Sequence, residues 1–294
     1  MAVEAIFKVD KISKRYPIGK REIEVLHNLE LEITPGEFVI LIGPSGCGKS
    51  TFMYLMFGLE PPSEGKIYFN NQDIFAMHED QRTELRSHHI AMVHQQPIWI
   101  KALSVRENVA FPLLLHRIPK SDAVAKADRM LHVLNLEKLA NQHPHELSVG
   151  EQQRCSLMRS LITEPEVIFA DEPTGNLDTD SSIVVMELLK TINEQLGKTI
   201  IMVTHNMSHM PYGSKIVSMI DGKIVNVEVK RPPASPDNNK GISDILGSWA
   251  DRNATATTKP ASDSSATGKV QTQVKSKPSL AQEISKPQTK VTKP

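Results

Sequence analysis

The clearest chemistry in the sequence lies in residues 43–50, which read GPSGCGKS. Their spacing fits the pattern G-x-x-x-x-G-K-[ST], whose glycines let successive backbone N–H groups turn inward around a phosphate. Lys49 could then neutralise the terminal phosphates of a nucleotide, and the Ser50 hydroxyl could ligate magnesium. Cys47 lies inside the motif, where we expect a small tolerated residue rather than a redox role. The predicted phosphate-binding residues are Gly43, Pro44, Ser45, Gly46, Cys47, Gly48, Lys49, Ser50 and Thr51.

Three more polar residues stand at the ends of apolar runs. Residues 167–171 read VIFAD and are followed by Glu172, while residues 199–205 read TIIMVTH and end in His205. In parallel sheets, ligands bind outside the carboxyl ends of the strands. Asp171 could hold magnesium there, Glu172 could polarise an attacking water, and His205 could orient that water against a phosphate. Together with the phosphate-binding loop, these residues predict a hydrolytic site.

A second anion-binding candidate lies in residues 146–154, which read ELSVGEQQR. Ser148 and Gly150 precede a stretch with helical spacing, and a helix start offers a hydroxyl and free backbone N–H groups to an anion. Serine is also an ordinary helix cap with no ligand. The residues alone leave both interpretations open.

The elements that must position these residues follow from hydrophobic patterning. Three short apolar runs, at 38–42, 167–171 and 199–204, predict strands buried on both faces of a parallel sheet. Between the last two, residues 181–198 have helical spacing, with Gly197 as the predicted stop. This order predicts an α/β fold. Residues from about 98 to 160 read as mostly helical, with Ser121 as a predicted helix cap.

Composition places the 294-residue chain among globular proteins, with a net charge of zero and 39% hydrophobic residues. Cys47 and Cys155 are the two cysteines, so we expect no disulfide framework and a reducing compartment. The first residues contain charges and lack the apolar core of a signal peptide. We expect no membrane-spanning segment, so another chain must supply any membrane part.

Composition changes near Arg231. Residues 231–294 are rich in Ser, Thr, Pro, Lys and Gln, and we predict a disordered tail, because so few apolar residues cannot offset the entropy of ordering. The tail is basic and the folded part acidic, so contact with anionic lipid or nucleic acid is conceivable, but a quiet solvated extension is favoured and nucleic acid is unlikely as a partner. Residues 241–252 place four apolar side chains on one helical face.

A series of separated motifs in this order resembles the nucleotide-binding subunits of ABC transporters: the loop at 43–50, Gln95 in MVHQQP, LSVGEQQR, VIFADEPTGNLD with its Asp178, and VTH. The resemblance covers about residues 4–227. It implies an ABC ATP-binding domain over residues 1–230, with a RecA-like core, an antiparallel β edge and a helical subdomain at about 96–163.

The resemblance also implies roles for individual residues, with ATP and Mg²⁺ as cofactors. Tyr16 resembles the aromatic residue that stacks on adenine. The alternative is that Tyr16 is a tyrosine buried in a strand with no contact to a nucleotide. Gln95 resembles the glutamine that ligates magnesium and faces the transport subunit. Ser148 and Gly150 resemble the signature that grips ATP, and Asp178 resembles the acid of the loop that communicates across a dimer.

In that family two subunits pack head to tail, so Ser148 of one copy is implied to close on the ATP held by the other. Lys49, Gln95, Glu172 and His205 are then the implied catalytic residues, and Ser50, Gln95 and Asp171 the metal ligands. Val149 departs from the usual LSGGQ, and it would cost about 1–2 kcal/mol if that position needs a positive φ.

Shorter phrases, DEPTGNLD, LSVRENVAFPLL and PHELS, resemble the branch with the lipoprotein-release ATPase LolD, the macrolide-export ATPase MacB and the division ATPase FtsE. A homodimer driving separate transmembrane subunits from the cytoplasmic face of the inner membrane is implied. Trp99 and Ile98 would face that partner or pack within the helical insert. A regulatory or cell-division ATPase with low turnover and no transported substrate is the alternative.

Overall fold

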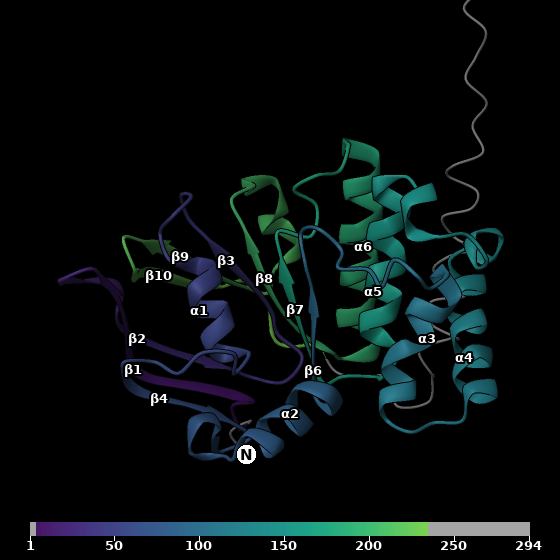
Figure 1. Ribbon diagram of the computed structural model, residues 1–294. Helices are drawn as coiled ribbons and strands as arrows, with labels where there is room; N and C mark the ends of the chain where they lie inside the picture. Colours follow the sequence, from purple (N-terminus) through teal and green to yellow (C-terminus); the bar gives the residue numbers. More distant parts are fainter. Residues whose placement is uncertain (1–3, 235–294) are drawn as a thin grey trace, which may run out of the picture. The chain divides into compact units, whose positions relative to one another are not determined.

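Residues 4–234 are described in the computed structural model of this chain, and they form two β-sheets (Figure 1). The smaller sheet is antiparallel and has the strand order β2-β1-β4-β5. The larger sheet has the order β10-β9-β3-β8-β7-β6, and all its neighbours pair in parallel except β10 with β9. The strands are β1 (Phe7–Ile18), β2 (Arg21–Ile33), β3 (Phe38–Ile42), β4 (Glu64–Phe69), β5 (Gln72–Asp73), β6 (Ile90–Val93), β7 (Val167–Asp171), β8 (Thr199–Thr204), β9 (Lys215–Ile220) and β10 (Lys223–Val229).

Helices cover the larger sheet, and Figure 1 shows α3, α4, α5 and α6 grouped on one side of it, with α1 on the side of the smaller sheet. The α-helices are α1 (Lys49–Met56), α2 (Glu79–His88), α3 (Val105–Leu115), α4 (Lys120–Val133), α5 (Val149–Leu161) and α6 (Thr179–Leu196). Short 3₁₀ helices are η1 (Ile74–Ala76), η2 (Glu137–Leu139), η3 (Pro144–Glu146) and η4 (Met207–Tyr212).

Strand β3 lies between two hydrophobic cores. Phe38, Ile40 and Ile42 pack into the core formed with α3, α4, α5 and α6. Val39 and Leu41 pack into the core formed with α1 and the smaller sheet. Alternate side chains of a strand point to opposite faces, so both faces of β3 are buried. The prediction of buried parallel strands at β3, β7 and β8 is confirmed.

Helix ends follow local chemistry. Helix α6 stops at Gly197, which adopts the left-handed conformation (φ 61°) as expected for a C-terminal glycine. The prediction that Ser121 caps a helix is wrong. Helix α4 already begins at Lys120, with Pro119 at the cap position, so Ser121 lies inside the helix. The Ser121 hydroxyl instead donates to the Asp122 carboxylate at 3.2 Å. Proline supplies a preset φ and lacks an N–H group, so it suits a helix start.

The last described residues stay in contact with the fold. Arg231 donates to the Glu194 carboxylate at 2.9 Å and to the Tyr212 carbonyl at 2.7 Å. The backbone N–H of Ala234 donates to the Gly36 carbonyl at 2.9 Å. The remainder of the predicted tail, with the amphipathic segment 241–252, lies outside the described residues. Within residues 4–234, no helix is long and apolar enough to cross a bilayer.

Candidate active site

The loop at residues 43–48 leads from β3 directly into α1 and leaves that helix start open. Gly48 occupies the cap position in the left-handed region (φ 97°), and no side chain caps the helix. A Cβ at Gly43 would lie 2.1 Å from the Met219 carbonyl oxygen, so only glycine fits there. The loop borders a cavity of about 190 Å³ that Glu172 also lines. Open N–H groups at a helix start attract anions, so the cavity suits phosphate.

Lys49 is buried beneath this loop. Its ammonium group donates to the carbonyl oxygens of Gly43 at 2.9 Å and Pro44 at 2.8 Å. The ammonium group therefore lies within the turn that would surround a phosphate. Cys47 is buried as well, and its carbonyl accepts the Gly222 N–H at 3.1 Å. This backbone hydrogen bond joins the loop to the turn between β9 and β10.

Asp171 ends β7 beside the start of α1, where two hydroxyl groups bind it. The Ser50 hydroxyl donates to Oδ1 at 3.2 Å, and the Tyr54 hydroxyl donates to Oδ2 at 3.0 Å. Burial first and the Asp171 charge second raise the pKa of Tyr54. Hydroxyl and carboxylate oxygens are the ligands that Mg²⁺ prefers, so Ser50 and Asp171 fit a magnesium site.

Glu172 and His205 form a pair at the carboxyl ends of β7 and β8. The ring nitrogen Nδ1 of His205 lies 2.9 Å from the Glu172 carboxylate, whose side chain is 22% exposed while that of His205 is 61% exposed. Glu172 has φ 44°, and its N–H donates to the Val203 carbonyl at 2.9 Å. A left-handed glutamate costs about 1–3 kcal/mol and is typical of functional positions. Glu172 is therefore held where a reacting water could reach it.

Gln95 and Tyr16 lie at the margins of this site. Gln95 follows β6 and its amide lies against Gly175, where a Cβ would come within 2.6 Å of Nε2. The Tyr16 hydroxyl donates to Glu60 at 2.7 Å, and the Lys14 ammonium lies 4.9 Å from the Tyr16 ring centroid. Burial and the Glu60 contact raise the pKa of Tyr16 to about 12. Tyr16 is half-buried, so part of its ring faces solvent.

Ser148 and Glu151 form a capping box at the start of α5. The Ser148 hydroxyl and N–H donate to the Glu151 carboxylate at 2.7 and 2.9 Å, and the Glu151 N–H donates back to Ser148 Oγ at 3.4 Å. This contact lowers the pKa of Glu151. Val149 occupies the first helical position, has no positive φ and is 51% exposed. The strain considered for Val149 is therefore absent.

Gly150 and Asp178 both lie next to Ser181, in the first turn of α6. A Cβ at Gly150 would lie 2.7 Å from the Ser181 hydroxyl oxygen, so α5 and α6 approach closely there. Asp178 caps α6 by accepting the Ser181 N–H at 2.9 Å and its hydroxyl at 2.7 Å. The hydrogen bond from the Ser181 backbone N–H has the larger effect and that from the Ser181 hydroxyl the next, and both lower the pKa of Asp178. In the described residues, the side-chain hydrogen bonds of Ser148 all involve Glu151, so the signature does not join its own phosphate loop.

One contact in the site escaped prediction from the sequence, and one open alternative is decided by the structure. Tyr54 was not singled out, although it follows Ser50 by four residues and so shares a face of any helix that begins at Lys49. Trp99 was expected either to face a partner or to pack within the helical insert, and it packs half-buried on the helical core and donates to Gln152 at 3.1 Å. Ile98 beside it is 65% exposed. The Trp99 contact depends on a distant residue and has no local signal.

A phosphate-binding loop, an acid held by the loop's serine, and a glutamate–histidine pair on adjacent strands define a P-loop nucleotide hydrolase. The model of the ABC transporter family matches residues 26–175. The chain is 40% identical over 222 residues to an uncharacterized ABC transporter ATP-binding protein, MJ1508, of Methanocaldococcus jannaschii, covering 76% of this chain and 99% of that one.

A second relative is the lipoprotein-releasing system ATP-binding protein LolD of Colwellia psychrerythraea, which is 35% identical and matched over 78% of this chain and 92% of its own length. Among solved structures, the dimeric ATP-binding cassette MJ0796 bound to ADP and Pi has a TM-score of 0.72 at 36% identity, covering 77% of this chain and 99% of that one. The chain belongs to the ABC transporter family, as an ATP-binding and ATP-hydrolysing subunit. The predicted family, fold class and activity are confirmed.

Proposed function

We propose that two copies of this chain clasp two ATP molecules head to tail and thereby drive a separate transmembrane subunit. The observation that carries the proposal is the start of α5, where Ser148 and Val149 are exposed and the Ser148 side chain bonds only to Glu151 among the described residues. An exposed helix start that its own phosphate loop does not use suits a phosphate held by a second copy. A dimeric relative supports this arrangement.

Each pocket then combines residues of known geometry. Lys49 and the loop hold the phosphates, while Ser50 and Asp171, with Gln95 from the segment after β6, hold magnesium. Bound magnesium supplies positive charge that offsets the charge of the phosphates. Glu172 accepts a proton from the attacking water, and His205 orients it. Tyr16 stacks on the adenine, Ser148 and Gly150 contact the phosphate of the other copy, and Asp178 contacts the second subunit.

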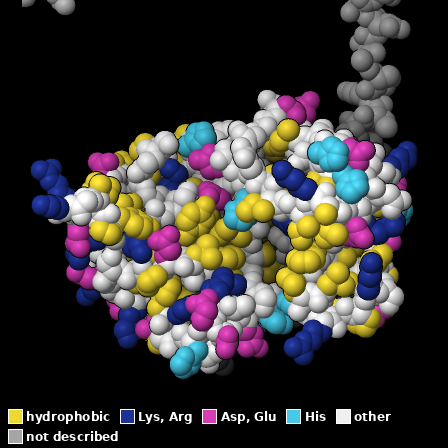
Figure 2. All heavy atoms as spheres, viewed as in Figure 1, with side chains coloured by type: hydrophobic (Ala, Val, Ile, Leu, Met, Phe, Trp, Pro, Cys, Tyr) yellow, Lys and Arg dark blue, Asp and Glu magenta, His cyan; other side chains and the backbone are white. Residues whose placement is uncertain are grey.

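The transmembrane partner docks in a groove of about 230 Å³ between β6 and α3. Figure 2 shows a hollow with apolar side chains on both sides in this part of the molecule. Pro112, Leu115 and Met92 line the groove, and Leu115 is 67% exposed. Apolar side chains that gather around a groove are typical of an interface.

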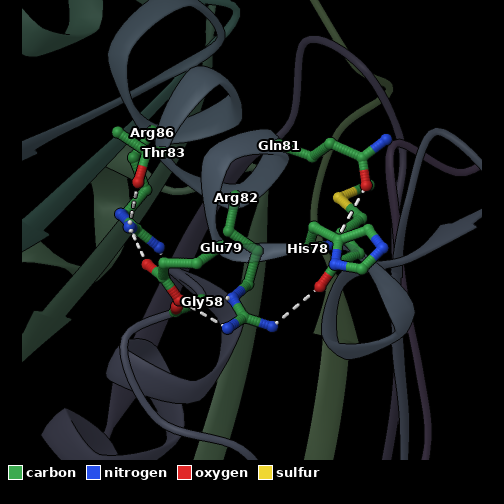
Figure 3. Close-up of polar contacts among 8 residues, drawn as sticks. Gly58, His78, Glu79, Gln81, Arg82, Thr83 and Arg86 are labelled. Carbon is green, nitrogen blue, oxygen red and sulfur yellow. Dashed lines mark hydrogen bonds and ion pairs between the residues drawn. The ribbon is translucent and has the colours of Figure 1, made fainter.

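One wall of the groove carries a positioned cation, Arg86. Figure 3 shows Arg86 beside Glu79, with Gly58 close by. The Arg86 guanidinium donates to Glu79 at 2.7 Å and to the Gly58 carbonyl at 3.0 Å, which ties α2 to the end of α1. The groove therefore combines apolar surface with a guanidinium held in place. Because Glu79 already pairs with this guanidinium, the groove suits mainly an apolar segment of the partner.

The relatives named as lipoprotein-releasing ATP-binding proteins support a process of that kind. We propose that the chain binds the cytoplasmic face of the inner membrane through its partner and powers export, lipoprotein release or force transmission to the periplasm. The matched relative MacB of Vibrio parahaemolyticus is named as an ATP-binding and permease protein in one chain. For the present chain, we propose that a separate membrane chain supplies the permease.

The dimer is tested with Glu172→Gln, which keeps the shape of the side chain but removes the base. Sedimentation velocity with saturating ATP and magnesium is expected to show a dimer, and turnover is expected to fall at least about 100-fold. Glu166→Gln is the matched control, because Glu166 precedes the same strand and also contacts a histidine, His89, at 2.7 Å. A Glu172→Gln protein that remains a monomer under these conditions contradicts the proposal.

The groove is tested by co-purification of the full chain from solubilised membranes. Leu115→Asp is expected to abolish recovery of the membrane chain while leaving ATP hydrolysis by the isolated protein unchanged. Ile220→Asp provides the control, since Ile220 is 48% exposed and lies on β9 outside the groove. Equal recovery of the membrane chain with both variants contradicts the assignment of the groove.

A further inference from the structure

We propose that Tyr54 is a positioning residue for the magnesium site, acting through Asp171. The inference deepens the proposed function, because it concerns how the same site holds its metal. Its basis is the hydrogen bond that the Tyr54 hydroxyl donates to Asp171 Oδ2 at 3.0 Å, on the opposite oxygen from the one that Ser50 contacts.

Helix α1 brings the two hydroxyls to the same carboxylate. Ser50 and Tyr54 are four residues apart, and such residues lie one above the other on a helix face. The shorter Ser50 reaches Oδ1 at 3.2 Å, and the longer tyrosine reaches Oδ2 from the next turn. The carboxylate is thus held at both oxygens by one rigid element. Rotation of the Asp171 side chain breaks at least one of these hydrogen bonds.

This hold matters because Asp171 ends its strand where the backbone changes direction. Glu172, the next residue, is left-handed, so the chain turns sharply directly after the metal-binding acid. A carboxylate at such an end depends on side-chain contacts for its orientation. Hydrogen bonds to ligating carboxylates commonly change metal affinity by about 10-fold to 100-fold when removed. Tyr54 supplies such a bond without touching the metal position assigned to Ser50 and Asp171.

A purely structural role makes a different prediction. The Tyr54 ring packs against the core shared by α1 and the smaller sheet. Tyr54→Phe keeps that ring and removes only the hydroxyl. If packing were the whole role, Tyr54→Phe would leave magnesium dependence unchanged. If the hydroxyl orients Asp171, the variant requires more magnesium for the same nucleotide-bound state.

The experiment compares magnesium titrations of the full chain and of Tyr54→Phe. The half-saturating magnesium concentration for ATP turnover is expected to rise about 10-fold, with kcat at saturating magnesium within about 2-fold of the unaltered protein. The second readout needs no turnover: in the Glu172→Gln background, the magnesium concentration that raises the melting temperature with ATP is expected to shift by the same factor. Tyr68→Phe, on β4, serves as the control and is expected to shift neither.

The outcomes separate this inference from the proposed function. Unchanged magnesium dependence in both readouts overturns the role of Tyr54, even if Glu172→Gln dimerises with ATP. A shifted dependence in a protein that never dimerises supports the role of Tyr54 and contradicts the proposed dimer. A fall in kcat at saturating magnesium without a shift in the magnesium titration also overturns the inference, because it indicates damage outside the metal site.

Discussion

Two helices of this protein begin with the same four-letter pattern, S-V-x-E, and only one of them is assigned to ATP. Helix α3 starts at Ser104, with Val105 and Glu107, and α5 starts at Ser148, with Val149 and Glu151. Both form the reciprocal capping box, in which serine and glutamate satisfy each other's backbone N–H groups. The capping chemistry is therefore the same in both places.

The surroundings of the two helix starts differ. Val105 is fully buried in the helical core, while Val149 is 51% exposed. The third position is Arg106 in α3, where it bonds to Asp128, and Gly150 in α5, where a Cβ would lie 2.7 Å from the Ser181 hydroxyl oxygen. The proposed ligand site thus differs from the ordinary cap in its exposure and in the residue two positions after the serine, and the serine alone does not distinguish the two helix starts. This comparison provides matched variants for testing the assignment.

The largest expected effect separates the two serines. Ser148→Ala is expected to lower ATP turnover by about 10-fold to 100-fold, since it removes a hydrogen bond to a charged phosphate worth about 1.5–3 kcal/mol. Ser104→Ala is expected to leave turnover unchanged. Both variants are expected to lose about 1 kcal/mol of unfolding free energy in urea, because each loses a cap. Equal turnover in the two variants would remove the distinction between the helix starts.

A smaller effect is expected at the two glutamates. Glu151 stands where the family's LSGGQ has glutamine, and its negative charge lies beside the position proposed for a phosphate. Glu151→Gln removes that repulsion and keeps an amide that can complete the capping box, so the ATP concentration for half-maximal dimerisation is expected to fall about 2-fold to 5-fold. Glu107→Gln is the control and is expected to change nothing in this measurement. A rise after Glu151→Gln would contradict the proposed closeness of phosphate and carboxylate.

The smallest expected effect on activity is at the valines. Val149→Gly is expected to leave ATP turnover within about 2-fold, because Val149 has an ordinary helical conformation and faces solvent, and to cost about 0.5–1 kcal/mol of unfolding free energy. Val105→Gly is expected to cost about 2–4 kcal/mol, since it also leaves a cavity in the core. Turnover that increases 10-fold or more in Val149→Gly would show that valine obstructs the nucleotide, and would favour the low-turnover alternative.

Much of the site could be predicted because its parts lie at sequence-local ends of strands. The apolar runs of β3, β7 and β8 predict buried strands. Asp171 is the last residue of β7, Glu172 and His205 directly follow β7 and β8, and Lys49 follows β3 across one short loop. The geometry of Tyr54 could not be reached in this way, because its partner Asp171 lies 117 residues away. The four-residue spacing between Ser50 and Tyr54 indicates that they share a face of α1, but it does not indicate that Asp171 is their common partner.

The antiparallel sheet was expected only from the family resemblance. Its strand β1 pairs with β2 and β4 through several register irregularities, with a left-handed Lys11 among them, and this blurs the alternation that would mark a strand. The start of α4 was misjudged because a serine two residues into the helix matched the usual cap, whereas Pro119 sets the boundary. Side-chain identity predicts caps less well where a proline competes for the position.

Strand β3, with one core on each of its faces, has a mechanical consequence. The phosphate loop follows the end of β3, which packs against the helices on one face and against α1 and the smaller sheet on the other. Close-packed interiors yield little when pressed, so neither layer can slide without carrying the loop along. The phosphate loop is therefore tied to both layers, and a shift of either layer is expected to change the position of the loop.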